Sequence, residues 1–265
     1  QIGEISDINR IFMGVVKPGF DYYVNVLSDQ AIPYRFSISV SDIPIDDGKI
    51  REIESNDLAI QANPLDIGIR KFGTSWDGNN DIDFFRLNLA KDGILNVQFS
   101  RPNGIGSSII EVLNSASQPI GTFIANFASG QKGNISLNLK AGAYFVKITP
   151  QNESPSAEYS LVAMYIETVK VSYINPDGKE IPKDTQLKAG DSIVLELIWN
   201  VENDKALFSI GDDESKKIEM SQVSNGKYKG IYTIIQGDKI TNAPITLYIE
   251  DKSSNKAEIL LDMIN

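Results

Sequence analysis

The 265-residue chain contains no histidine and no cysteine. Without histidine it cannot build a Ser-His-Asp or Cys-His catalytic group, a His-bearing zinc site, or the commonest general base at neutral pH. Without cysteine it has no thiol chemistry, iron–sulfur cluster or disulfide bond. Carboxylates and lysines remain for catalysis, and oxygen ligands remain for metals, which favours calcium or magnesium. The composition therefore predicts that the protein is not an enzyme.

The chain also lacks an excess of basic residues and a long apolar run. Its net charge is −10, with 25 Lys and Arg against 35 Asp and Glu. No nucleic-acid partner is expected, because a phosphate backbone requires clustered basic residues. The apolar run Ser192–Trp199 contains a glutamate and is far shorter than a membrane span, so the chain is not expected to span a membrane. No signal peptide is visible at Gln1, which leaves a cytosolic chain or a mature or trimmed piece of an exported one.

What the sequence does contain is a regular succession of short alternating runs. Runs rich in Ile, Val, Tyr, Phe and Thr, such as Asp83–Leu89 and Thr168–Ile174, recur about every 8–12 residues. Turn signals separate them, among them Asp92-Gly93, Ala141-Gly142 and Pro176-Asp177-Gly178. The pattern predicts an all-β fold of antiparallel sandwiches or barrels, and of the two we expect tandem antiparallel sandwiches.

Two segments repeat the same order of features. Ile11–Val40 and Ile135–Met164 both read as a strand, a Lys-x-Gly turn, an aromatic-rich strand, a polar loop and a final strand. Because only the second copy follows a long stretch of similar texture, we expect residues 1–45 to be the last strands of a truncated sandwich. Chance similarity among β-hairpins is the alternative.

Two further parts are expected after this segment. Residues 46–166 are predicted to form a complete sandwich, and residues 167–265 a second one. The second part fits seven short strands over about 100 residues, the size of an immunoglobulin-like sandwich. It has no cysteine pair, so its core would be held by packing alone.

Four motifs in residues 51–166 carry a resemblance to a known family. They are EIESND (Glu52–Asp57, followed by Ala62), DIDFFRLNL (Asp81–Leu89), LKAGAYFVKI (Leu139–Ile148) and AEYSLVAM (Ala157–Met164). Together they resemble the bacterial pre-peptidase C-terminal family, a jelly-roll-like β-sandwich appended to secreted peptidases, collagenases and cell-surface proteins. Residues 1–40 resemble only the C-terminal third of that family. Residues 169–264 are similar to bacterial immunoglobulin-like surface modules, with Ser254 where many carry a turn glycine.

Two acidic clusters are the candidate functional site. In an extended segment Glu52, Glu54 and Asn56 fall on one face, roughly 7 Å apart. They would repel each other unless a cation or backbone donors lie between them. A second cluster occupies Ser75–Asp83, and calcium takes six to eight oxygen ligands.

In collagen-binding members of the family, the resemblance implies a calcium site that joins these two clusters. The ligands it implies here, with the Ser75 carbonyl among them, are Glu52, Glu54, Asn56, Asp57, Ser75, Asn80, Asp81 and Asp83. Asn80 stands where a carboxylate is expected, with Asp77 or Asp81 as substitutes. This departure makes a second ion less expected than a first.

The same residues have a purely structural alternative. Ser55, Asn56 or Asp57 could cap a helical turn over Leu58–Ala62. The residues before Asp83 could form a solvated turn, with Asp83 directed outward.

The function that we expect is structural or adhesive. The chain would be a non-catalytic, calcium-stabilised extracellular module of a prokaryotic cell-surface, surface-layer or secreted multidomain protein. Its partners would be the other domains of that protein. The alternative is a targeting module of a secreted peptidase or other hydrolase, which would bind collagen, another protein fibre or a polysaccharide.

Overall fold

The computed structural model describes residues 23, 35, 48–75, 81–101, 107–126, 132–151, 157–199, 205–211, 217–238, 240–252 and 254–264. Apart from Tyr23 and Arg35, the predicted truncated sandwich at residues 1–45 lies outside this set. The described residues form strands and one 3-10 helix, η1 (Ala59–Gln61), with no α-helix among them. The predicted all-β class is therefore confirmed.

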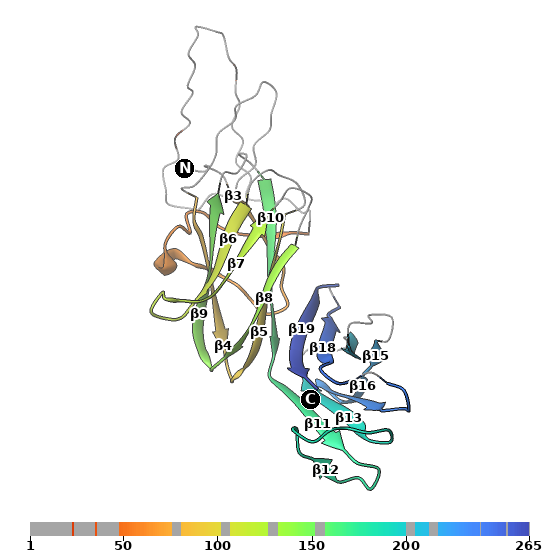
Figure 1. Cartoon of the computed structure of the whole chain (residues 1–265). Coiled ribbons are helices and arrows are strands. Elements are labelled where there is room, and N and C mark those ends of the chain that lie inside the picture. The colour runs from red at the N-terminus through yellow and green to blue at the C-terminus, as the bar shows by residue number, and fades with distance from the viewer. Residues whose placement is uncertain are drawn as a thin grey trace.

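The first half of the described chain is a sandwich of two five-stranded sheets (Figure 1). One sheet has the order β1-β3-β10-β5-β8 and the other β2-β4-β9-β6-β7. The strands are β1 (Ile50–Arg51), β2 (Asn63–Pro64), β3 (Lys71–Ser75), β4 (Asp83–Leu89), β5 (Gly93–Ser100), β6 (Ser107–Leu113), β7 (Pro119–Asn126), β8 (Lys132–Leu139), β9 (Gly142–Gln151) and β10 (Ala157–Ile166).

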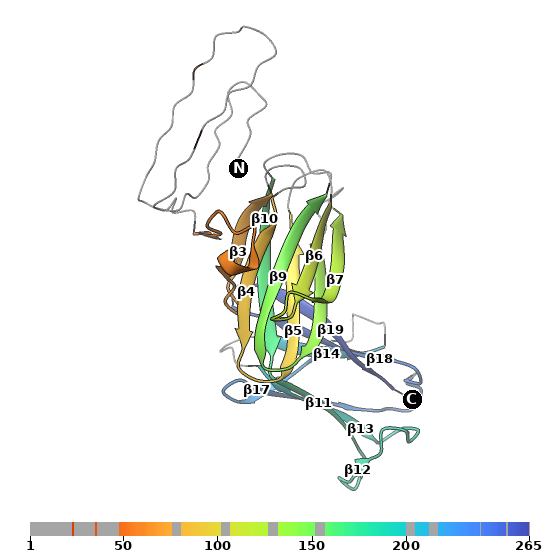
Figure 2. The ribbon, with the colours of Figure 1, turned by 90° about the vertical axis from the view of Figure 1, so that its left-hand side faces the viewer.

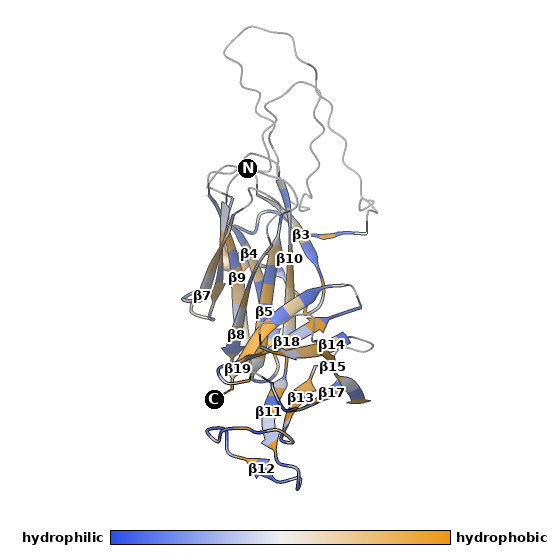
Figure 3. Ribbon diagram, turned by 45° about the vertical axis from the view of Figure 1, so that its right-hand side comes forward, coloured by the Kyte–Doolittle hydropathy of each residue, from blue (hydrophilic) through white to orange (hydrophobic). Residues whose placement is uncertain are grey.

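Alternation along the strands builds the core of this first sandwich. In β4 the side chains of Phe85, Leu87 and Leu89 are buried between the sheets, while Arg86 and Asn88 face solvent. Successive side chains of a strand point to opposite faces, so one apolar set per strand is enough to fill the interior. Burying each such side chain contributes about 1.5–3 kcal/mol. Figure 3 shows the resulting mixture of hydrophobic and hydrophilic residues along single strands.

The second half is another sandwich, of a five-stranded and a four-stranded sheet. The sheet orders are β12-β11-β13-β17-β16 and β15-β14-β18-β19. The strands are β11 (Thr168–Ile174), β12 (Glu180–Ile181), β13 (Ser192–Ile198), β14 (Lys205–Ile210), β15 (Ile218–Glu219), β16 (Ser221–Ser224), β17 (Lys227–Thr233), β18 (Pro244–Glu250) and β19 (Lys256–Met263). The described residues of this part form nine strands rather than the expected seven, because β12 and β15 add two-residue pairings at sheet edges.

The second core is centred on large side chains and needs no disulfide. Trp199 is 1% exposed and lies 6.2 Å from Tyr228, ring centroid to centroid. Phe208 and Leu247 complete its centre from the opposite sheet. Met164 and Ile166, at the end of β10, also pack in this second core. The predicted boundaries of the parts stay a prediction.

The two sandwiches are joined by a single residue. β10 ends at Ile166 and β11 begins at Thr168, and the intervening Glu167 N–H donates to Ile198 O at 3.0 Å. A second contact lies beside the connection, where the buried Asn255 accepts a hydrogen bond from Arg70 and donates one to Gly68 O. The connection therefore has no flexible linker.

Left-handed residues close two of the turns in the second sandwich. Gly178, in the predicted Pro-Asp-Gly turn, has φ of 79°, a region that glycine adopts freely. Ser254 has φ of 59° in the turn between β18 and β19. The Ser254 N–H donates to Asp251 O there, so the turn is kept without glycine.

Replacing Ser254 by glycine should stabilise the protein. A left-handed conformation costs an L-residue about 1–2 kcal/mol, and glycine avoids this cost. Part of the gain is offset, because glycine loses more chain entropy on folding than serine does. We expect Ser254→Gly to raise the free energy of unfolding by about 0.5–1 kcal/mol in a urea titration. The control is Ser221→Gly in the exposed strand β16, which should lower it. An equal loss of unfolding free energy in both variants would contradict the inference that the backbone is strained at Ser254.

Candidate metal centre

A strap made of residues 50–66 holds the first sandwich together at one side. Its strand β1 pairs with β3 of one sheet, and its strand β2 pairs with β4 of the other. Between these pairings Glu52 N–H donates to Phe72 O at 2.8 Å, and Phe84 N–H donates to Asn56 O at 2.9 Å. The strap thus crosses from one sheet to the other, beside β3 and β4 (Figure 2).

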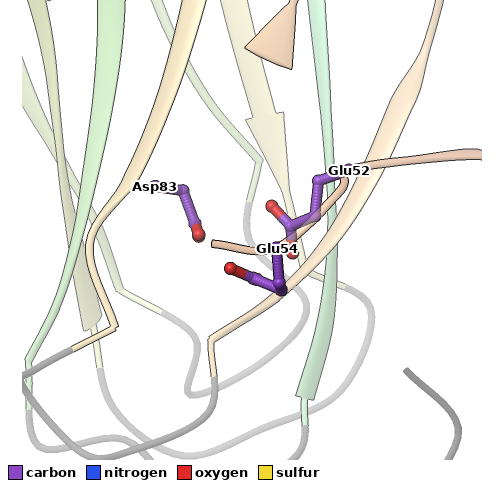
Figure 4. Close-up of side chains that lie close together, drawn as sticks. All are labelled: Glu52, Glu54 and Asp83. Carbon is purple, nitrogen blue, oxygen red and sulfur yellow. The ribbon is translucent and has the colours of Figure 1, made fainter. Parts of the chain in front are cut away.

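Three carboxylates converge behind the strap. Glu52 and Glu54 come from the strap itself and Asp83 from the first residue of β4, and one oxygen atom of each lies within 4.8 Å of the other two (Figure 4). Glu52 is 4% exposed, Asp83 is 0% exposed and Glu54 is half-buried. Two of the three carboxyl groups are thus removed from solvent, which disfavours bare negative charge on them.

Tyr159 of β10 lies between two of these carboxylates. Its hydroxyl oxygen is 2.7 Å from Glu52 Oε2 and 2.7 Å from Asp83 Oδ2. A phenol has one proton, so it can donate to only one of the two at a time. The other contact is favourable only if that carboxyl is protonated or a cation neutralises it.

Packing fixes the position of Tyr159. Its ring stacks on Phe99 at 5.1 Å between centroids, and its hydroxyl lies over Gly73 of β3. A Cβ at Gly73 would stand 2.3 Å from the Tyr159 hydroxyl and 2.5 Å from Glu52 Oε2. The main-chain N–H of Thr74 donates to Glu52 Oε1 at 2.6 Å. Only glycine at position 73 permits this close approach.

Asn56 faces the same group of oxygens and is fully buried. With its amide nitrogen toward the carboxylates, it donates to Glu54 Oε2 at 3.0 Å and Asp83 Oδ1 at 3.2 Å, and its oxygen accepts from Asn63. In the opposite orientation its nitrogen is 3.4 Å from Glu52 Oε2 and its oxygen meets the carboxylate oxygens of Glu54 and Asp83. Asn56 can therefore act as a donor to the cluster or as a further oxygen ligand.

The electrostatics of the cluster are unfavourable for bare carboxylates. Burial first, and the charge of Glu54 second, raise the pKa of Glu52 to about 8. Burial followed by the charges of Asp81 and Asp57 raises the pKa of Glu54 to about 7. Burial and then the charge of Glu52 raise the pKa of Asp83 well above its usual range. Each of these groups thus favours a bound proton, or a cation in its place.

The structure brings together most of the predicted ligands. Glu52, Glu54, Asn56 and Asp83 meet in one cluster. Asp81 is buried and its charge raises the pKa of all three carboxyl groups, although it is not one of the three converging carboxylates.

The remaining predicted ligands lie at the margin of the cluster or beyond the described residues. Asp57 is half-exposed, and its charge acts on Glu54. Ser75 is the last residue of β3, where its main chain pairs with Ala157. Asn80 and Asp77 lie outside the part of the chain that the structure describes.

The structural alternative for these residues is wrong in two respects. The N-cap of the helical turn is Leu58, which makes no side-chain hydrogen bond, so none of Ser55, Asn56 and Asp57 caps it. Asp83 is directed inward rather than outward, because it occupies a buried position in the alternation of β4.

Sequence reasoning missed Tyr159, Gly73 and Asn63. Tyr159 is 76 residues from Asp83 in the sequence, and the two meet only because their sheets pack face to face. Tyr159 lies within the AEYSLVAM motif, but nothing in that motif indicates that its hydroxyl contacts carboxylates. Asn63 both donates to Ile53 O and accepts from Ile53 N–H, which closes the strap on itself.

The raised pKa of Glu52 sets the sign of a pH effect. A group that binds its proton more tightly in the folded state stabilises the fold fully below its unfolded pKa, here about 4.5. That contribution is lost as the pH rises toward the folded value of about 8. We therefore expect the free energy of unfolding, measured with a chelator present, to fall between pH 4.5 and pH 8.

Glu52→Gln should remove much of this pH dependence. The introduced amide can accept from Thr74 N–H and donate to the Tyr159 oxygen, which leaves the tyrosine proton for Asp83. In chelator at pH 8 we expect a gain of about 1 kcal/mol, or roughly 2–4 °C in melting temperature.

The matched control is Glu158→Gln, at the residue that precedes Tyr159 on strand β10. Burial raises the pKa of Glu158, but hydrogen bonds from Lys49 and Arg51 outweigh burial and lower it. Its stabilising contribution is therefore present above the ordinary pKa and lost in acid. Glu158→Gln should destabilise at pH 8. A loss of stability in Glu52→Gln under the same conditions would contradict the inference that Glu52 and Asp83 compete for the single proton of Tyr159.

Comparison with known proteins gives weak similarities only. No family model matches the sequence, and no curated protein matches it. Similar solved structures include the pre-peptidase C-terminal domain of collagenase from Bacillus anthracis, 18% identical, with 38% of this chain and 93% of that domain covered at a TM-score of 0.33. A β-glucuronidase from Ruminococcus gnavus is 7% identical at a TM-score of 0.24, with 68% of this chain and 35% of the enzyme chain covered. A β-glucuronidase from Bifidobacterium dentium is 9% identical at a TM-score of 0.25, with 68% of this chain and 38% of the enzyme chain covered.

A pre-peptidase C-terminal domain, the family that residues 51–166 resemble in sequence, is thus among the similar solved structures. The similarity of the second sandwich to immunoglobulin-like surface modules stays a prediction. The described residues also include no helix with the length and apolar character that a membrane span requires.

Proposed function

We propose that this chain is a calcium-stabilised, non-catalytic β-sandwich module of an exported protein, with a structural or adhesive role. The observation that carries the proposal is the closed carboxylate cluster behind the strap. Glu52 and Asp83 compete for one tyrosine proton, and Glu54 adds a third carboxylate within 4.8 Å. A divalent cation would relieve this excess of negative charge at every contact.

The donor set fits calcium in kind and in spacing. Calcium binds oxygen at 2.3–2.6 Å, so two ligands of one ion are at most roughly 5 Å apart. The three converging oxygen atoms meet this limit. Glu52, Glu54 and Asp83 would hold the ion, and Asn56 would add its amide oxygen in the orientation that faces the carboxylates. With Asp57 and Asp81 nearby, the surroundings are acidic enough to favour a divalent ion.

Calcium at this position would supply neutralisation and cross-linking. Its ligands come from the strap and from β4, while Tyr159 of β10 contacts two of them from the other sheet. An ion held there would link the strap and both sheets.

An extracellular location accords with this chemistry. Calcium modules outside the cell work with dissociation constants of about 10⁻⁴–10⁻³ M. The chain has no cysteine, so a bound ion could supply the kind of cross-link that disulfide bonds supply in other exported modules. The alternative role, targeting of a hydrolase to collagen, another protein fibre or a polysaccharide, stays a prediction.

Calcium should raise the melting temperature of the metal-free protein. A ligand that binds only the native state stabilises it by RT ln(1 + [L]/Kd), which is about 0.4–1.4 kcal/mol when millimolar calcium is present at roughly 1–10 times its dissociation constant. We expect a rise on adding millimolar calcium at pH 7.5, measured by calorimetry. Magnesium should have a smaller effect, because it requires near-octahedral geometry and releases water reluctantly.

Asp83→Asn tests whether the ion binds at this cluster. The substitution keeps the shape of the side chain and removes one of the three charges, so the calcium-dependent rise should largely vanish. Asp66→Asn is the matched control, because Asp66 is exposed in the same strap. No rise in the unmodified protein, or an equal rise in Asp83→Asn, would contradict the proposal.

A further inference from the structure

The outer face of strand β10 is buried, although it points away from the core of its own sandwich. Tyr159, Leu161 and Ala163 belong to that core. The alternating residues Val162 and Met164 therefore lie on the opposite face of the sheet. Val162 is 1% exposed and Met164 is 2% exposed. The outer face of β10 is thus covered by another part of the chain.

The second sandwich supplies this cover. Met164 and Ile166 pack in its core, and Ile94 of the neighbouring strand β5 packs against that core. A hollow of about 280 Å³ is lined by Ile94 and Asn138 of the first sandwich and by residues of β11 and β19 of the second. In Figure 1 the second sandwich accordingly lies beside the lower part of β5, β8 and β10. The two sandwiches are therefore in side-by-side contact as well as being connected through Glu167.

Polar side chains on the outer face of β5 hydrogen-bond with their neighbours. Asn96, which lies opposite Met164 in the sheet, is 1% exposed. Its amide nitrogen donates to Ser136 Oγ at 2.8 Å, and the Gln98 amide nitrogen donates to Asn96 Oδ1 at 2.8 Å. Buried polar groups require such partners. These bonds allow a partly polar sheet face to be covered by the second sandwich.

Arg70 makes the polar part of the contact between the sandwiches. Its Nη1 donates to Ser160 Oγ of β10 at 3.0 Å, and its Nη2 donates to Asn255 Oδ1 of the second sandwich. Ser160 is 7% exposed and Asn255 is 0% exposed. The donors of a guanidinium group lie in one plane at fixed angles, so two acceptors on different elements must keep one arrangement to satisfy both.

Asn255 is held in place by its own sandwich. Its main-chain N–H donates to Asp251 Oδ1 at 2.8 Å and its Nδ2 donates to Asp251 Oδ2 at 2.7 Å. The same Nδ2 lies 3.3 Å from Gly68 O of the first sandwich. Because the amide nitrogen is engaged in this way, the amide oxygen faces Arg70. The contact between Arg70 and Asn255 therefore has a defined geometry on both sides.

We propose that the two sandwiches form a single cooperative body whose relative orientation is fixed by the hydrogen bonds from Arg70 to Ser160 and Asn255. The apolar contact at Met164 and Ile166 holds the sandwiches together. The bonds of Arg70 select one orientation, because buried polar groups lose their partners in any other. The proposal concerns the joint alone and does not depend on calcium in the first sandwich, so every measurement is made with a chelator present.

The distance between two spin labels tests the fixed orientation. The chain has no cysteine, so labels attach only at introduced ones. Ile124→Cys in β7 and Val223→Cys in β16 place one label at an exposed position of each sandwich. We expect pulsed electron resonance to give one distance distribution, as narrow as that of Ile60→Cys with Ile124→Cys, which are both in the first sandwich. A distribution clearly broader than this control would overturn the proposal.

Arg70→Met tests the role of the arginine, since it removes both hydrogen bonds and keeps an apolar stem. We expect the distance distribution to broaden and the melting temperature to fall by at least about 2–4 °C, because two bonds from a charged donor are lost. Arg86→Met is the matched control, because Arg86 is exposed on β4 of the same sandwich. It should change neither quantity. A distribution in Arg70→Met as narrow as in the unmodified joint would overturn the role of Arg70.

A double variant separates an effect through Asn255 from a local effect of Arg70. If the two residues act together, Arg70→Met should lower the melting temperature of Asn255→Ala by clearly less than that of the unmodified protein. Calorimetry of the unmodified chain should show one unfolding transition for both sandwiches. Two separate transitions, or equal losses from Arg70→Met in both backgrounds, would contradict the proposal. Where Asn255→Ala does not fold, the distance measurement on Arg70→Met decides.

Discussion

The fold of the first sandwich depends on how one tyrosine proton is shared between two buried carboxylates. Tyr159 belongs to one sheet, Asp83 to the other, and Glu52 to the strap that connects them, so a single hydroxyl group touches all three parts. Charge removed from water at this point must be matched by protons or cations, since the interior offers no solvent to do so. The side of the sandwich where the strap crosses is therefore held by ionic balance, whereas the middle is held by apolar packing.

Much of this arrangement is encoded locally, and the rest is not. Strand alternation predicts the all-β class and the burial of Phe85, Leu87 and Leu89, and it also places Glu52, Glu54 and Asn56 on one face of an extended strap. What no local pattern supplies is the partner across the sandwich. Tyr159 and Gly73 meet Glu52 only because β3 and β10 are neighbours in the sheet, a pairing between distant segments. The inward direction of Asp83 likewise follows from its register in β4.

In the second sandwich, too, part of the structure follows from local sequence and part does not. Its turns at Gly178 and Ser254 follow from sequence, but the two-residue strands β12 and β15 do not, because such short pairings are decided by the sheets around them. Because β12 is so short, it pairs only with Tyr173 and Ile174 of β11 in the described structure.

The single-residue connection between the sandwiches has a mechanical consequence. β10 is a central strand, flanked by β3 and β5, and it continues through Glu167 into β11, which is paired along its whole length with β13. Tension applied along the chain would pass from one sandwich to the next through these two strands. Their ladder bonds lie across the direction of pull, so many would be loaded together in shear instead of opening one by one. A molecule joined in this way would transmit force with little extension.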